Sequence, residues 1–228
     1  SLGLDVDNNS TITALSVANI TPVSIAGSKI LSGAITVTAG SLKLNETGTL
    51  ASTISMSGGV LDADESSTVS GALSHTADIT IDVADNKTLT YSGAAISLGA
   101  NTLTLSGGGT LVSGGLNLNN ASSKLLLNSI TVDNVSTSAN NLGLDVDNNS
   151  TVTSLSVGYI TPVSIASGKS LSGAITVTAG SLKLNETGTV ASTIAMSGGT
   201  LDADESLAVS GALTQSGNIT IDVADNKT

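Results

Sequence analysis

The 228-residue chain has no Cys, Trp or Phe, two Tyr, and seven basic residues, all of them Lys. Its net charge of −11 argues against a nucleic-acid partner and against binding to an anionic membrane surface, because both require a basic face. No apolar run approaches the roughly 20 residues of a membrane-spanning helix, so we expect no direct membrane insertion. Hydrophobic residues make up 39% and charged residues 11%, a balance typical of a folded chain.

Short alternating segments follow one another from the N-terminus onward. Ile35-x-Val37 precedes Leu42-x-Leu44, and Ile54-x-Met56 precedes Leu61-x-Ala63, with Gly-containing turns between them. Alternation with period two places one set of side chains inside and the other outside. Small and β-branched residues in Ser, Thr, Gly and Asn-rich surroundings favour such strands over helices.

These segments are grouped in coils of about 20 residues, a length typical of solenoids. Each coil begins with a marker, which is a small or β-branched residue next to an aliphatic one after a turn. The markers are Thr11-Ile12, Ile30-Leu31, Thr49-Leu50, Thr68-Val69, Thr88-Leu89, Thr110-Leu111, less clearly Ile130-Thr131, and then Thr151-Val152.

Three strands per coil predict an all-β fold, a three-sided parallel β-helix (β-solenoid). We expect it to be right-handed, because connections between parallel strands are overwhelmingly right-handed. The alternative is an array of antiparallel β-sandwiches, but such domains usually contain a core Trp or a Tyr corner.

A longer repeat of 140 residues organises the coils. When residues 1–88 are aligned with 141–228, 18 positions differ and 70 are identical. We predict a first unit of about seven coils at 1–140 and a partial second unit at 141–228, continuous in one solenoid. The chain starts without Met or a signal peptide, so we expect a segment of a longer tandem array.

The runs LSGAITVTAGSLKLNETGTL, STISMSGGVLDADESSTVSGAL and LGANTLTLSGGGTLVSGGLNL resemble the passenger regions of bacterial autotransporters and large repetitive adhesins. The resemblance lies in composition and periodicity and covers nearly the whole chain. It implies a right-handed β-helix, export to the bacterial cell surface, and a role in adhesion, aggregation or surface coating. It transfers no individual functional residue.

Aspartates recur near one corner of the coil in both units. We expect Asp62 and Asp82 to stack on adjacent coils, with Lys43 in the same position one coil earlier. Stacked carboxylates repel, and a hard cation would relieve that repulsion, which makes calcium a candidate ligand. The alternative is that these residues form solvated turns. The candidate metal ligands are Asp62, Asp64, Asp82, Asp85, Asp202, Asp204, Asp222 and Asp225.

Catalysis is not expected, although β-helices often host polysaccharide lyases and hydrolases. The chain has no Arg, and its single histidine, His75, is replaced by Gln215 in the second unit. A glycan-binding module predicts an irregular coil, which we place near 115–140, and exposed aromatics, for which Tyr91 and Tyr159 are the candidates. Ice binding requires Thr pairs on one face, and we expect Thr36/Thr38 and Thr88/Thr90 on different faces.

The sequence therefore predicts a structural or adhesive extracellular solenoid, forming a stalk, fibre or filament. The expected partners are further copies of the repeat, stacked end to end, and surface glycans or other cells.

Overall fold

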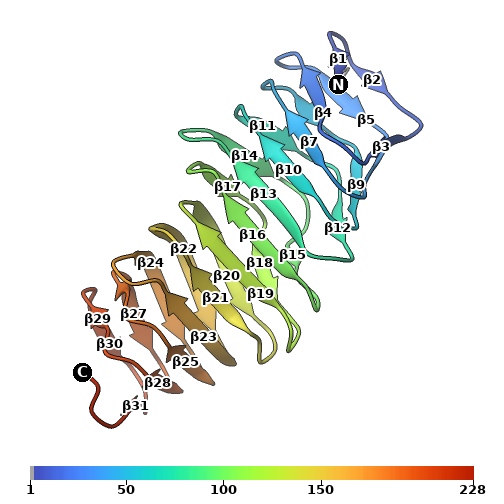
Figure 1. Ribbon diagram of the computed structural model, residues 1–228. Helices are drawn as coiled ribbons and strands as arrows, with labels where there is room; N and C mark the ends of the chain where they lie inside the picture. The colour runs from blue at the N-terminus through green and yellow to red at the C-terminus, as the bar shows by residue number, and fades with distance from the viewer. Residues whose placement is uncertain (1–2) are drawn as a thin grey trace. The chain divides into compact units, whose positions relative to one another are not determined.

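The computed structural model describes residues 3–228, which contain strands and turns. No helix in this range is long and apolar enough to cross a membrane. The chain divides into two compact units, unit 1 (residues 1–96 and 103–114) and unit 2 (residues 97–102 and 115–228). Within each unit, parallel strands from successive coils stack on one another (Figure 1).

Unit 1 has three strand-lined faces. The first face consists of β1 (Leu4–Val6), β4 (Thr21–Ile25), β7 (Ser41–Leu44), β10 (Val60–Ala63), β13 (Ile79–Val83) and β16 (Thr102–Ser106). The second consists of β2 (Ser10–Thr11), β5 (Ile30–Ser32), β8 (Thr49–Leu50), β11 (Ser67–Val69), β14 (Thr88–Tyr91) and β17 (Thr110–Val112). The third consists of β3 (Leu15–Val17), β6 (Ala34–Val37), β9 (Thr53–Met56) and β12 (Leu73–His75).

Unit 2 repeats this plan with longer strands that bend from the second face into the third. Its first face consists of β19 (Lys124–Asn128), β21 (Gly143–Val146), β23 (Ile160–Ile165), β25 (Ser181–Leu184), β28 (Thr200–Ala203) and β31 (Thr220–Val223). The bent strands are β20 (Thr131–Thr137), β22 (Ser150–Val157) and β24 (Ser170–Val177). Shorter strands complete these two faces: β15 (Ile96–Ser97), β18 (Leu116–Leu118), β26 (Thr189–Val190), β27 (Thr193–Met196), β29 (Ala208–Val209) and β30 (Leu213–Gln215).

Aliphatic columns form the core of each unit. On the first face of unit 1, Leu42, Leu61 and Ile81 are consecutive register partners, and each is at most 1% exposed. On the third face, Ile35 and Ile54 are partners and equally buried. This arrangement confirms the parallel three-sided solenoid and excludes the antiparallel sandwiches considered as the alternative.

Three expectations about coil register are wrong. Thr11 pairs with Ser32, not with Ile30, and Thr68 pairs with Thr90, two residues beyond the expected marker. Both shifts are even, so inward side chains stay inward. In unit 2, Thr131 pairs with Thr151, whereas the markers predicted that Ile130 would do so. The region near 115–140, where we expected an irregular coil, contains β18, β19 and β20.

The corner between the second and third faces requires glycine. In β24, Gly173 has φ of +122°, and a Cβ built there would lie 1.8 Å from the carbonyl oxygen of Val152 on the preceding coil. Gly33 is its equivalent in unit 1, where the Cβ would lie 2.0 Å from the Ile12 carbonyl. Coils can stack closely at this corner only because no side chain is present.

Candidate functional site

The predicted stacking of aspartates is confirmed on the first face. Asp62 of β10 and Asp82 of β13 are register partners, and Asp202 and Asp222 form the same pair in unit 2. Each aspartate lies between two inward-facing residues of its strand, so its side chain points outward. Parallel pairing thus places two carboxylates on adjacent coils, which lie about 4.8 Å apart.

A lysine one coil earlier neutralises part of this charge, as expected. Lys43 is the register partner of Asp62, and its Nζ lies 3.0 Å from Asp62 Oδ2 and 2.8 Å from Asp64 Oδ2. In unit 2, Lys183 contacts Asp202 at 3.1 Å and Asp204 at 3.4 Å. One ammonium group therefore serves two carboxylates, and a third carboxylate stands on the next coil.

In unit 1 the pKa values of Lys43 and Asp62 are both raised, but for different reasons. Hydrogen bonds from Lys43 to Asp64 and then to Asp62 raise the pKa of the Lys43 ammonium group. Burial raises the pKa of the Asp62 carboxyl in spite of its hydrogen bond with Lys43. The two shifts are compatible because Lys43 is shared between Asp62 and Asp64. Asp62 is the more buried of these two carboxylates, with its side chain 18% exposed. Because three carboxylates, those of Asp62, Asp64 and Asp82, surround one ammonium group, the cluster has an excess of negative charge.

The other two candidate ligands, Asp85 and Asp225, and two glutamates lie in the turns that follow first-face strands. Asp85 and Asp225 are exposed in the turns that follow β13 and β31. Lys87 pairs with Glu65 at 2.6 Å, and Lys227 pairs with Glu205 at 2.5 Å. Ser106 donates a hydrogen bond to Asp82. Acidic side chains of this corner therefore have lysine partners in both units, and Asp82 of unit 1 has a hydroxyl partner as well.

Within residues 3–228, no group of three or more His, Cys, Asp or Glu side chains is arranged to hold a metal ion. The calcium interpretation and the solvated-turn interpretation both stay predictions. Thermal melting with excess calcium and with chelator separates them: a shift in melting temperature supports calcium, and equal curves support turns.

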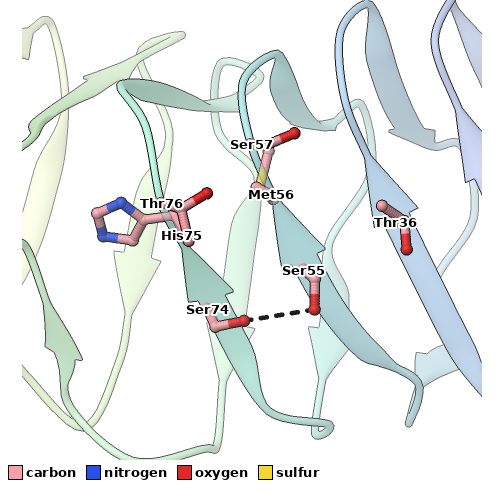
Figure 2. Close-up of a pocket in the computed structure, with 7 residues that line it drawn as sticks. All are labelled: Thr36, Ser55, Met56, Ser57, Ser74, His75 and Thr76. Atoms are coloured by element: carbon pink, nitrogen blue, oxygen red, sulfur yellow. Dashed lines mark hydrogen bonds between the residues drawn. The ribbon is translucent and has the colours of Figure 1, made fainter.

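A shallow hollow lies on the third face of unit 1. Thr36, Ser55 and Ser74 are consecutive register partners on β6, β9 and β12, and all three point outward (Figure 2). Ser74 Oγ donates to Ser55 Oγ over 3.5 Å. The other lining residues are Met56, Ser57, His75 and Thr76. The hollow therefore presents several hydroxyl groups and no acidic side chain.

Unit 2 contains the equivalent hollow. It is lined by Thr176, Ala195, Met196, Ser197, Thr214, Gln215 and Ser216, each 140 positions after its counterpart. Sequence analysis had not identified this region, because isolated Ser and Thr residues on strands carry no distinctive pattern. His75 Nδ1 lies 3.2 Å from the carbonyl oxygen of Ala77, and the change to Gln215 keeps a polar side chain at that position.

The tyrosines differ from the expectation for exposed aromatics. Tyr91 is 5% exposed, and its hydroxyl accepts a hydrogen bond from the Leu73 amide at 3.1 Å, so it belongs to the core. Tyr159 is 45% exposed, as expected. The Thr residues considered for ice binding are divided among faces, with Thr36 on the third face and Thr88 and Thr90 on the second.

The fold and the repeated outer residues define a β-solenoid repeat protein. No protein-family model, no curated protein and no solved structure matches the chain.

Proposed function

We propose that this chain is a structural or adhesive solenoid segment displayed outside a bacterial cell, on a stalk, fibre or filament. The observation that carries this proposal is the duplication of the outer surface together with the core. The Lys43 cluster with Asp62 and Asp64 recurs as the Lys183 cluster with Asp202 and Asp204. The hollow on the third face recurs as well. A surface repeated in this way suits a scaffold or a multivalent contact.

The physical design supports a durable scaffold. Each coil buries its aliphatic residues against neighbouring coils, so stability accumulates through nearest-neighbour contacts. Strand amides bond to the adjacent coil, as when the Val60 amide donates to the Gly40 carbonyl at 2.9 Å and the Thr200 amide donates to the Gly180 carbonyl at 3.0 Å. Proteases require an extended, accessible backbone, and this backbone is engaged along most strands.

Surface labelling tests the proposed location. Antibodies raised against residues 1–228 are applied to intact and to permeabilised cells of the source organism, with a cytoplasmic protein as control. We expect labelling of intact cells that is lost after protease treatment of the cell surface. Deletion of the gene is expected to reduce attachment or cell–cell aggregation. Labelling that requires permeabilisation would overturn the proposal.

A second candidate function, glycan binding, is favoured by the duplicated hollow. Its lining combines Ser and Thr hydroxyl groups with the apolar surface of Met56 or Met196, and a sugar, whose hydroxyl groups can exchange hydrogen bonds with Ser and Thr, also has both kinds of surface. Filling both hollows by Ser57→Arg and Ser197→Arg should abolish binding on a glycan array. Thr49→Arg with Thr189→Arg, on the second face, is the matched control. Cleavage of a bound polysaccharide would instead identify a polysaccharide-active enzyme.

A further inference from the structure

The hollows on the third face differ between the two units more than the rest of the repeat does. Of the 88 aligned positions, 18 differ between the units, whereas four of the seven positions that line the hollow differ. The four pairs are Ser55/Ala195, Ser74/Thr214, His75/Gln215 and Thr76/Ser216. By contrast, the lysine and aspartate cluster of the first face has the same residues in both units. The units therefore share the hollow but not its lining.

A serine hydroxyl stands at the centre of the hollow in unit 1. Ser55 of β9 pairs with Thr36 on the preceding coil and with Ser74 on the next coil, and Figure 2 shows its side chain between the other two. Ser74 donates a hydrogen bond to Ser55 Oγ at 3.5 Å. Because a hydroxyl group has one donor and two acceptor sites, Ser55 can accept this bond and still exchange hydrogen bonds with a ligand. The centre of this hollow is therefore polar.

An alanine methyl group occupies the same place in unit 2. Ala195 of β27 pairs with Thr176 of β24 and with Thr214 of β30. It lies between Ile194 and Met196, which are buried, so its methyl group points outward and lines the hollow. This hollow is also the larger one, with a volume of about 230 Å³ against about 160 Å³ in unit 1. Its centre offers apolar contact and no hydrogen bond.

A ligand group that meets the centre of each hollow is subject to opposite preferences. A sugar hydroxyl group placed against Ala195 loses its hydrogen bonds to water and gains no partner. A methyl group placed against Ser55 removes water from that hydroxyl group in the same way. Conversely, a methyl group against Ala195 withdraws apolar surface from water, and a sugar hydroxyl group against Ser55 can be hydrogen-bonded. One replaced side chain is therefore enough to change which sugar each hollow prefers.

We propose that the two hollows bind different sugars and that Ser55 and Ala195 determine the difference. The hollow of unit 1 binds a sugar that presents a hydroxyl group to Ser55, and the hollow of unit 2 binds a deoxy sugar that presents a methyl group to Ala195. This inference rests on the proposed glycan-binding function and names the specificity of its two sites. A chain with both hollows thus recognises two components of a mixed glycan, not one component twice.

Chains with a single open hollow test the proposal. Ser197→Arg fills the hollow of unit 2 and leaves that of unit 1 open, and Ser57→Arg does the reverse. Nuclear magnetic resonance titration compares sugars that differ in one hydroxyl group, L-galactose against L-fucose and L-mannose against L-rhamnose. In a pair that binds, we expect the unit 1 hollow to prefer the hydroxylated sugar and the unit 2 hollow to prefer the deoxy sugar. Each preference should be about three- to tenfold, the contribution of one hydrogen bond.

Reciprocal substitutions assign the difference to one position. Ser55→Ala in the Ser197→Arg chain should shift the preference toward the deoxy sugar, and Ala195→Ser in the Ser57→Arg chain should shift it toward the hydroxylated one. Ser24→Ala, on the first face of unit 1, is the matched control and should leave the preference unchanged. Circular dichroism verifies that all variants are folded.

Three results overturn the inference. The first is the same preference in both single-hollow chains, and the second is a preference that the reciprocal substitutions leave unchanged. Either result leaves glycan binding itself intact. The third is the absence of binding to all four sugars, after which the glycan array decides separately whether the hollows bind any glycan.

Discussion

Residues 81–88 and 221–228 have the same sequence but different environments. Ile81 is 1% exposed and Ile221 is 54% exposed, although both occupy the inward side of a first-face strand. The difference arises because β16 follows β13 in unit 1, whereas β31 is the last first-face strand of unit 2. In a solenoid, the neighbouring coil therefore buries the inward side chains. The sequence of a coil determines only which of its side chains point inward.

The greatest loss of stability is expected at Ile81, the buried member of this pair. Ile81→Ala should lower the free energy of unfolding by about 2–5 kcal/mol, because it leaves a cavity between two coils. Ile221→Ala should change that free energy by no more than about 0.5 kcal/mol, since the side chain is mainly in solvent. Urea denaturation of the two variants and the wild-type chain measures both. Equal losses in the two variants would contradict the assignment of burial to the neighbouring coil.

Much of this architecture was predictable from sequence. Alternation at Ile35-x-Val37 and Ile54-x-Met56 identified inward positions, and the coil length of about 20 residues identified parallel stacking. The 140-residue repeat likewise predicted that the lysine and aspartate clusters occur twice. These features are local or periodic, so each can be recognised from the sequence alone.

Register at the corners was not predictable in the same way. Between β10 and β11 the corner has three residues, 64–66, whereas between β13 and β14 it has four, 84–87. The pairing Asp62 with Asp82 follows an offset of 20, but Thr68 pairs with Thr90 at an offset of 22. Corner length is decided by turn geometry and by contacts with adjacent coils, which a marker pattern does not encode. The hollow around Ser55 was missed for a related reason, since it exists only when three coils are stacked.

Two glycines with positive φ, Gly173 and Gly168, differ in how closely the preceding coil approaches them. Gly173→Ala should cost more than about 2 kcal/mol, because its Cβ would overlap the Val152 carbonyl of the preceding coil as well as requiring positive φ. Gly168 also has positive φ, at +72°, but no atom lies within 4 Å of a Cβ built there. Gly168→Ala should therefore cost only about 1 kcal/mol, the backbone penalty. Thermal melting of the two variants measures the difference, and similar melting temperatures would show that coils separate easily at this corner.

The smallest effect concerns charge on the first face and depends on pH. Burial raises the pKa of Asp62, so the folded chain binds this proton more tightly than the unfolded chain does. The stability contributed by the protonated carboxyl is present at low pH and is lost as pH rises through the raised pKa. Wild type should therefore gain stability relative to Asp62→Asn as pH falls from 7 toward 4. Asp222→Asn, which makes the same replacement at an exposed position of the same face, is the control for the change of side chain. Urea denaturation at several pH values measures the change, and the same pH dependence in wild type and Asp62→Asn would mean that solvent reaches this carboxylate despite its neighbours.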